Sequence, residues 1–258
     1  MKYFRKKRLE TALTVIFCIF IFIYGSKKLE VSWIEVFKRF ANAADRFIID
    51  YLPVDFSEFS RQSEQLINTV FLSIAGSATG VILGLLSALM ISVKTSPNTF
   101  VKTVIRTIAS ICRNIPEGIW AIILLLCFWF GNFLAYLVMS IISYGFLTRV
   151  FADTIDETNS DAIEALEATG AGYWQIIIHG VLPETMPALI SWSLYSIENN
   201  IRSATIVGML AGGGIGYLMN IYKGFAQFPL MMSAILMVTI LIIITDRVST
   251  VIRRRIMS

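Results

Sequence analysis

Long runs of apolar residues are the feature that most constrains how this chain can fold. Residues 66–93 and 229–244 contain no Asp, Glu, Lys or Arg. A run of about 18 or more mostly apolar residues is long enough to cross a bilayer as a helix. The whole chain is 56% hydrophobic and 16% charged, whereas soluble domains are about 45–50% apolar and about 25% charged. The sequence therefore predicts an all-α integral membrane protein.

The apolar pattern predicts about six transmembrane helices. We expect them at residues 11–25, 66–93, 118–130, 133–151, 186–209 and 229–244. We interpret residues 1–258 as one membrane domain, with an N-terminal span at 1–26, a mixed segment at 27–65 and a core at 66–250. The first run is short and follows a basic head, a pattern also found in cleaved signal peptides. The sequence leaves both alternatives open: the first helix is retained, or it is cleaved as a signal peptide.

The distribution of basic residues predicts the orientation of the chain. The formal net charge is +4, and Lys and Arg gather in the N-terminal head, in 94–113 and in the C-terminal stretch. The positive-inside rule therefore places both termini in the cytoplasm and makes 94–113 a cytoplasmic elbow. Segment 27–65 is then extracellular. Its apolar residues recur at steps of three and four, which predicts an amphipathic helix on the membrane surface, ended by Pro53.

Glycines occur in two patterns that indicate close helix packing. Gly76, Gly80 and Gly84 share one face of the predicted second span, and small residues on one face allow helices to approach closely in lipid. The second pattern, AGGGIG at residues 211–216, includes Gly212 and Gly216. It lacks the flanking strand and the Lys-Ser/Thr of a phosphate-binding loop. We interpret it as a packing site or a break in the helix.

The polar segment at 152–185 is the most informative part of the sequence, because a connection of this length is uncommon unless it has a function. Asp161, followed three residues later by Glu164, predicts the start of a short helix that Gly170 ends. Residues 173–183 predict a second short helix that stops near Pro183. We therefore expect two short helices that meet at a glycine corner on the cytoplasmic face.

This segment resembles the cytoplasmic loop signature of ABC importer permeases. That signature is Glu-Ala-Ala, three residues, Gly, nine residues, Ile, one residue and Leu-Pro. The chain has Glu164-Ala165-Leu166, then Gly170, then Leu182-Pro183 at the same spacing. It departs from the pattern at Leu166, where the family has Ala, and at Gly180, where the family has Ile. Residues 113–216 further resemble the phosphonate-type permeases, which belong to the MetI-like fold.

The resemblance implies a function and a set of partners. Such a permease pairs with a second copy or a related chain, binds a pair of ABC ATPase subunits and receives solute from an extracellular or periplasmic binding protein. It implies a multi-pass protein of the bacterial cell membrane, in contact with lipid and not with nucleic acid. It implies no enzyme activity and no cofactor in this chain, because ATP and Mg²⁺ bind the ATPase. The implied solute is a phosphonate or a related phosphorus oxyanion such as phosphite or phosphate. The implied ATPase-coupling residues are Glu164, Ala165, Gly170, Leu182 and Pro183.

Two ionisable residues lie inside the predicted fifth span, where a charge is costly unless it is paired or lines a water-filled path. Glu198 and Arg202 are four residues apart and can pair along one helix face. They are either a structural ion pair or part of a translocation path, because a guanidinium matches the oxygens of a phosphate-like anion. The sequence shows no metal-ligand spacing.

Two alternatives remain open from the sequence, and a third, a membrane enzyme, lacks the residues that it would need. A permease of the same ABC class could carry a different small solute. An ATP-independent channel or secondary transporter would predict internal symmetry with unwound spans at matching places, and the glycine interruption occurs once, near residue 212. A membrane enzyme would need a cluster of His, Cys or Asp at membrane depth.

Overall fold

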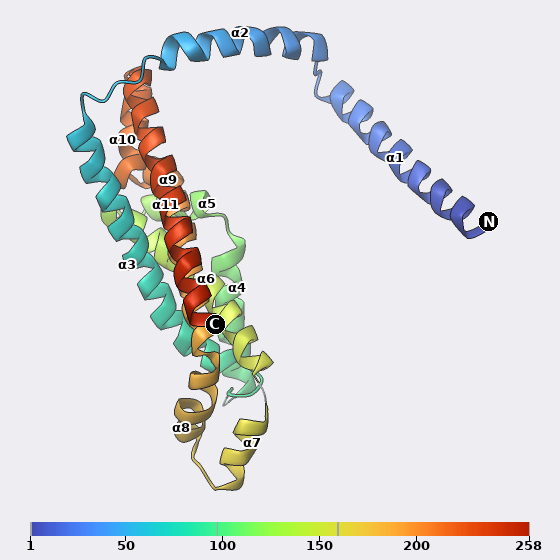
Figure 1. Ribbon diagram of the computed structural model, residues 1–258, viewed down its shortest axis with the longest axis vertical. Coiled ribbons are helices and arrows are strands. Elements are labelled where there is room, and N and C mark those ends of the chain that lie inside the picture. Colours follow the sequence, from blue (N-terminus) through green and yellow to red (C-terminus); the bar gives the residue numbers. More distant parts are fainter. Residues whose placement is uncertain (1, 97, 159, 258) are drawn as a thin grey trace. The chain divides into compact units, whose positions relative to one another are not determined.

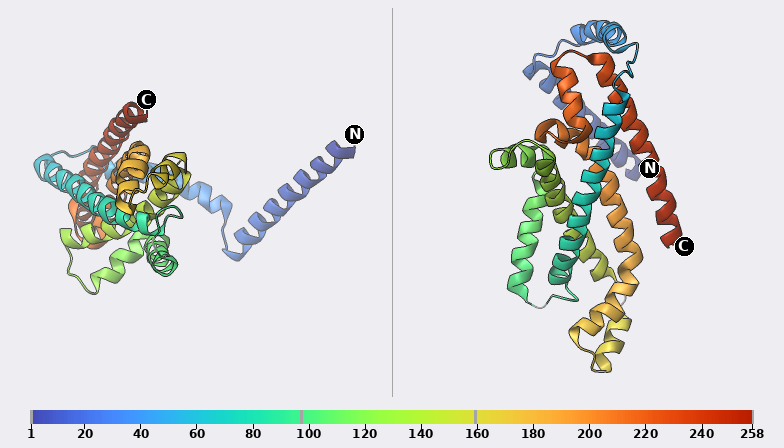
Figure 2. Two further views of the ribbon diagram at one scale, coloured as in Figure 1. Left: turned by 90° about the horizontal axis from the view of Figure 1, so that it is seen from below. Right: turned by 90° about the vertical axis from the view of Figure 1, so that its left-hand side faces the viewer.

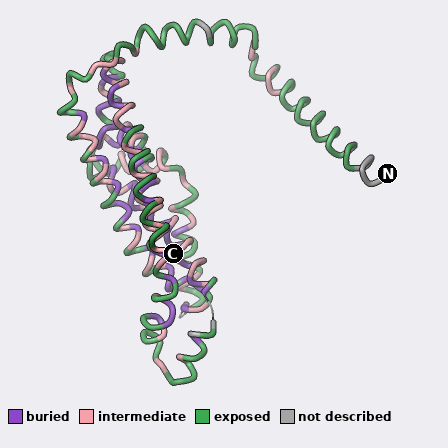
Figure 3. Tube along the Cα trace, in the orientation of Figure 1, coloured by how far each residue is buried: buried purple, intermediate pink, exposed green. Residues whose placement is uncertain are grey.

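The computed structural model describes residues 2–96, 98–158 and 160–257, and it divides into two compact units. The first unit, Met1–Leu52, contains α1 (Lys2–Lys28) and α2 (Trp33–Tyr51). The described residues of both helices are exposed almost throughout, as the colours of Figure 3 show. An apolar helix satisfies its backbone hydrogen bonds internally and is therefore suited to lipid. The apolar part of α1, Glu10–Lys28, is long enough to cross a membrane.

Helix α2 has the amphipathic character that the sequence predicts. The hydroxyl of Ser32 caps its start by accepting a hydrogen bond from the Glu35 backbone N–H, at 3.4 Å. The helix ends at Tyr51, two residues before Pro53, because the residue before a proline disfavours the helical conformation.

The second unit, Pro53–Ser258, is a helical bundle that carries a small helical module at one end (Figure 1). Its elements in chain order are α3 (Phe59–Ile91), α4 (Thr99–Asn114), α5 (Glu117–Leu125), α6 (Asn132–Glu157), α7 (Ser160–Ala168), α8 (Tyr173–Ile176), the π-helical turn η1 (Ile177–Val181), α9 (Leu182–Ala211), α10 (Gly214–Gly224) and α11 (Phe228–Met257). Helices α3, α6, α9 and α11 run along the bundle, and α7 and α8 lie at the end toward which α11 runs (Figure 2).

Helices α3 and α6 approach each other closely along a row of glycines. A Cβ atom on Gly76 would lie 2.7 Å from the Cβ of Met139, and one on Gly84 would lie 3.1 Å from the Cβ of Leu147. At Gly80, between them, the corresponding approach to Ser143 is closer still. These three positions therefore face α6, and the absence of side chains on α3 lets the two backbones come together.

Glycines also shape the corner between α9 and α10. Helix α9 ends at Gly212, which has φ +86°, a left-handed conformation that glycine adopts without steric cost. A Cβ atom on Gly216 would collide with the backbone carbonyl of Thr205, so α10 packs directly against α9. The glycine-rich stretch thus forms both a helix break and a close contact.

The membrane-crossing capacity of the described helices agrees with the predicted all-α fold of about six spans. Four helices are long and apolar enough to cross by themselves: the apolar part of α1, α3, α6 and α11. Two bent pairs, α4 with α5 and the continuous α8–α9 segment with α10, raise the number to six if each pair is one span. The bends are 97° and 50°.

The third span differs from its prediction. Residues 118–130 do not form one helix, because α5 has only 9 residues and ends at Leu125. The basic segment at 94–113, expected to be a cytoplasmic elbow, instead forms most of helix α4, which packs beside α6. Its Lys and Arg residues recur at helical spacing, so a helix can gather them on one face. The sequence prediction missed this helix because it counted these charges without considering their periodicity.

Other boundaries also moved. Helix α3 begins at Phe59, so the end of the predicted interfacial segment 27–65 belongs to the core bundle. Asp161 lies within the first turn of α7 instead of at its cap, and a carboxylate there is favourable for the helix dipole. The second short helix does not stop near Pro183: it continues through η1 into α9, because Pro183 occupies the first turn of α9, where a missing N–H costs little.

Candidate functional site

The helical module at the end of the bundle consists of α7, α8 and η1. Helix α7 ends at Ala168, and Gly170 then reverses the chain with φ +77°. The side-chain oxygen of Gln175 accepts a hydrogen bond from the backbone N–H of Gly172 at 2.7 Å, which fixes the start of α8. The two short helices therefore meet at a glycine corner, as the sequence predicts.

Buried apolar side chains hold this module against the bundle. Ile163 of α7 and Ile177 and Val181 of η1 are 8%, 1% and 0% exposed, respectively. They belong to one core cluster with residues of α3 and α6, among them Leu147 and Phe151. Burying an isoleucine or valine contributes about 1.5–3 kcal/mol. The module is thus a packed extension of the bundle, able to transmit a displacement.

Hydrogen bonds tie the same end of the bundle to the segment after α3. The Asp156 carboxylate of α6 accepts from the Ser92 hydroxyl at 2.6 Å and from the Val93 backbone N–H at 2.7 Å. The Tyr173 hydroxyl of α8 donates to the carbonyl of Thr95 at 2.9 Å. These contacts join the end of α3, α6 and α8 at one place.

The structure places the predicted coupling residues on two different surfaces. Glu164 and Ala165 on α7 and Gly170 at the corner are exposed at the tip of the module. Leu182 is half-buried against the core cluster, and Pro183 lies on the exposed side of the first turn of α9. The tip is therefore free for a partner, whereas Leu182 lies at the junction between the module and the bundle.

Glu198 forms the centre of a charged cluster between α9 and α11. Its side chain is 5% exposed and accepts hydrogen bonds from Arg202 and, at 3.0 Å, from Arg253 of α11. Arg202 also lies 3.9 Å from Asp246. The charges of the two arginines balance those of the two carboxylates. The buried carboxylate, that of Glu198, connects α9 to α11. This geometry favours the structural ion pair over the translocation path.

A second polar cluster lies inside the bundle where α3, α6 and α9 meet. The side-chain amide of Asn200 donates to the hydroxyls of Ser77, at 2.8 Å, and Ser143, at 2.7 Å. The Ser196 hydroxyl donates to Ser143 at 3.2 Å. All four residues are buried. Polar groups at this depth need partners, and interhelical hydrogen bonds supply them.

Comparison with known proteins identifies the family. Residues 80–258 match the family described as binding-protein-dependent transport system inner membrane component. The chain belongs to this family. It is thus a permease subunit of a bacterial transport system and a component of the inner membrane, and it is not an enzyme.

Relatives and solved structures agree with this assignment. The permease is 30% identical over 203 residues to the phosphite transport system permease protein PtxC of Stutzerimonas stutzeri, covering 79% of this chain and 74% of PtxC. It is 37% identical to the putative cryptic phosphonate transport system permease protein PhnE2 of Escherichia coli K12, covering 42% of this chain and 88% of PhnE2. Its fold is similar to that of a chain in the inward-facing MetNI methionine ABC transporter, with a TM-score of 0.68, 18% identity and coverage of 79% and 99%. The MetI-like fold of an ABC importer permease is therefore confirmed.

The two departures from the loop signature contact each other in the permease. A Cβ atom on Gly180 would lie 3.0 Å from the Cδ1 of Leu166. The larger side chain at 166 therefore occupies the space that the smaller residue at 180 leaves free. Sequence spacing could not show this compensation, because α7 and η1 meet only after the chain turns at the glycine corner.

This contact gives a testable expectation. Gly180→Ile should destabilise the module by about 1–3 kcal/mol, because extra methylenes in a packed site force shifts. Adding Leu166→Ala should recover most of the loss, since the pair then matches the family pattern. A double-mutant cycle of thermal unfolding in detergent measures the coupling. Additive effects of the two substitutions would contradict a direct contact.

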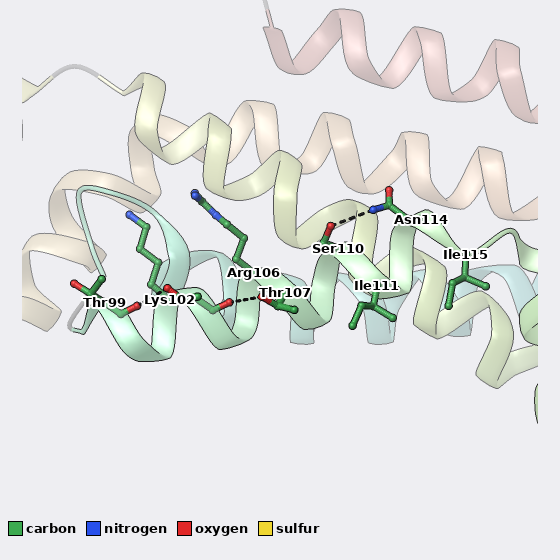
Figure 4. A pocket seen from close by; sticks show the side chains of 9 residues that line it. Thr99, Lys102, Arg106, Thr107, Ser110, Ile111, Asn114 and Ile115 are labelled. Carbon is green, nitrogen blue, oxygen red and sulfur yellow. Dashed lines mark hydrogen bonds between the residues drawn. The ribbon is translucent and has the colours of Figure 1, made fainter.

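The polar face of α4 is a feature that was not predicted from the sequence. Lys102, Arg106 and Ser110 lie along one side of this helix and line a groove of about 710 Å³ (Figure 4). Arg113, one turn before the bend, lines two smaller cavities. The signal was present as polar residues at steps of three and four from Thr99 to Asn114, but the segment was interpreted as an elbow.

Proposed function

We propose that the permease forms the membrane path of an ABC importer for a phosphorus oxyanion and couples to its ATPase through α7, α8 and η1. The observation that carries the proposal is the packed module with an exposed tip at Glu164, Ala165 and Gly170. The relatives named for phosphite and phosphonate transport support the solute class. The loop signature supports the coupling role.

The coupling mechanism follows from the way in which the module is attached. A partner that binds the exposed face of α7 and moves would displace Ile163, which is packed into the core. The displacement would be transmitted to α3 and α6 through the apolar core cluster that contains Ile163 and through the Tyr173–Thr95 hydrogen bond. Helix α9 receives it directly, because η1 continues into α9 without a loop. ATP and Mg²⁺ would bind the ATPase, so this chain needs no cofactor for the movement.

The proposed assembly has a defined orientation. The tip of α7 would face the cytoplasm together with both termini, and the end of the bundle that contains α10 would face a solute-binding protein outside. A pair of ATPase subunits would bind a pair of permeases, either two copies of this chain or this chain with a related one. The basic residues near the module and in the last turn of α11 support this orientation.

Charge reversal at the tip tests the coupling role. We expect Glu164→Arg to reduce co-purification of the ATPase with the permease by about tenfold, because an interface residue of this kind contributes on the order of 1–2 kcal/mol. Glu64→Arg, an equally exposed charge reversal near the start of α3, is the matched control and should leave co-purification unchanged. Full ATPase binding and uptake by the Glu164→Arg variant would refute the assignment.

A further inference from the structure

Helix α4 has two exposed faces of opposite character. One carries hydroxyls, an amide and cations, among them Lys102, Arg106, Ser110 and Asn114, which point to the same side of the helix in Figure 4. The other carries exposed apolar residues such as Val104 and Ile108, and the groove on the polar face also has apolar lining from Ile111 and Ile115. The apolar face is suited to lipid. The polar face is not, because a cation in the hydrocarbon region is costly unless it meets water or a partner.

Among the residues that the structure describes, the cations on this helix have no carboxylate partner. Within residues 2–96, 98–158 and 160–257, no Asp or Glu oxygen lies within 4.0 Å of Lys102, Arg106 or Arg113. Arg149 of α6, which faces the same region, pairs with Asp153 at 2.7 Å. The region therefore carries an uncompensated positive charge, which attracts anions and raises their local concentration.

Three hollow spaces follow one another along these cations. The groove along α4 shares Arg106 and Ser110 with a cavity of about 150 Å³ that Arg113 and Arg149 also line. Arg113 in turn lines a cavity of about 160 Å³. A space of about 10–15 Å³ is enough for one water. Each of these cavities can therefore hold a small anion with part of its hydration shell.

The last of the three spaces borders the polar cluster of Ser143, Ser196 and Asn200 inside the bundle. The cavity of about 160 Å³ is lined by Ser143, Ser196, Asn199 and Asn200 in addition to Arg113. The donors of Asn200 and Ser196 already bond to Ser77 and Ser143, so Asn199 and the Ser143 hydroxyl are the groups besides Arg113 that can donate to the oxygens of an anion. Arg113 lies fourteen residues after Thr99, about 20 Å along the helix axis.

Gly145 is the reason that α4 and α6 form these cavities together. A Cβ atom on Gly145 would lie 2.8 Å from the carbonyl oxygen of Ala109 and 2.8 Å from the backbone nitrogen of Arg113. The backbone of α6 therefore contacts α4 directly. This contact places Arg106 and Arg113 beside Arg149 around one space.

We propose that Arg113, together with Arg106, binds the transported tetrahedral phosphorus oxyanion inside the membrane, and that the polar face of α4 is the water-filled route to this site. The inference rests on the proposed function and names the binding residues for its substrate class. A guanidinium presents paired donors that match the oxygens of such an anion. The exposed route lets the anion leave toward the cytoplasmic end of α4.

The test uses the full complex of permease, ATPase and binding protein in vesicles. Uptake of phosphite, methylphosphonate and inorganic phosphate is measured for wild type, Arg113→Gln, Arg113→Lys and Arg39→Gln. We expect Arg113→Gln to lower uptake at least about tenfold, from the loss of charged hydrogen bonds, while assembly and ATP hydrolysis stimulated by the binding protein stay at the wild-type level. Arg113→Lys should lose only about threefold, because it keeps the charge. Arg39→Gln, on exposed α2, should behave as wild type.

The outcomes separate the two proposals. If wild type transports none of the three anions, the proposed function fails. If wild type transports them and Arg113→Gln does so equally well, only the binding role of Arg113 is overturned. Vesicles of phosphatidylcholine alone and vesicles with added phosphatidylglycerol distinguish solute from lipid. If Arg113→Gln lowers uptake in both kinds of vesicle, the proposal is supported. If it lowers uptake only in vesicles with phosphatidylglycerol, the arginine binds lipid headgroups and the proposal is overturned.

A labelling measurement keeps the proposal testable if Arg113→Gln fails to assemble. In a variant whose three cysteines are replaced, Thr107→Cys in the groove should react with a charged, water-soluble thiol reagent in the assembled complex. Ile108→Cys, on the apolar face, should not react. An unreactive Thr107→Cys would show that another protein or lipid covers this face, and would overturn the water-filled route.

Discussion

Glu198→Leu is expected to destabilise the folded permease by about 3 kcal/mol, because removing one partner of a buried charge cluster leaves the other charges uncompensated. The carboxylate is 5% exposed and neutralises Arg202 and Arg253. The Arg253 side chain is 23% exposed, so it has little water to replace its lost partner. Thermal unfolding in detergent, followed by the loss of monodisperse protein, measures the effect.

Two further variants identify the cause of this loss. Glu198→Leu combined with Arg253→Met should recover much of the stability, because a buried ion pair can be replaced by apolar side chains at little net cost. Asp153→Leu removes one partner of the Arg149–Asp153 pair, in which both side chains are about half exposed, and should cost less than about 1 kcal/mol. A stable Glu198→Leu variant that has lost uptake would instead assign Glu198 to the translocation path.

Gly80→Ala should destabilise the permease by about 3 kcal/mol, and Gly80→Leu should abolish the recovery of folded protein. A Cβ atom at this position collides with Ser143, and the backbone of α6 cannot move away without separating the two helices. Overpacking typically costs about 1–3 kcal/mol. The displacement would also disturb the hydrogen bond that Asn200 donates to Ser143. Unfolding temperature and yield after membrane extraction report the result.

The neighbouring glycines give a graded series for the same measurement. The Cβ approach is 3.1 Å at Gly84 and 2.7 Å at Gly76, so Gly84→Ala should cost least, Gly76→Ala more and Gly80→Ala most. Gly224→Ala is the control, because no heavy atom lies within 4 Å of its added Cβ. Equal losses at all four positions would show that α3 and α6 are not held by this contact.

Much of the fold could be predicted from the sequence because the bilayer restricts the choices. Backbone groups in hydrocarbon must bond internally, so an apolar run of sufficient length becomes a helix. The prediction was accurate to within two residues for 66–93, of which α3 includes 66–91, and 133–151 lies within α6. The glycine corner of the module was also predicted, since glycine at residue 170 permits the left-handed turn that the structure shows.

The helix ends were less predictable because they depend on packing. Pro183 is an ordinary stop signal, yet the chain continues through η1 into α9. Ile177 and Val181 are fully buried in the core cluster, and this burial holds the π-helical turn in place. Local propensity cannot report such a tertiary contribution, which outweighs the local preference.

What the sequence by itself determined is the membrane class, the approximate number of spans and the loop signature, because these depend on the length of apolar runs and on local spacing. Only the tertiary structure decided which charges are paired. The fold joined Glu198 to Arg253 across 55 residues of chain. In the part of the chain that the structure describes, it left Arg113 beside cavities with no carboxylate partner. The physical reason is that the energy of a charge in a membrane is set by its neighbours in space, and those neighbours come from helices far apart in the sequence.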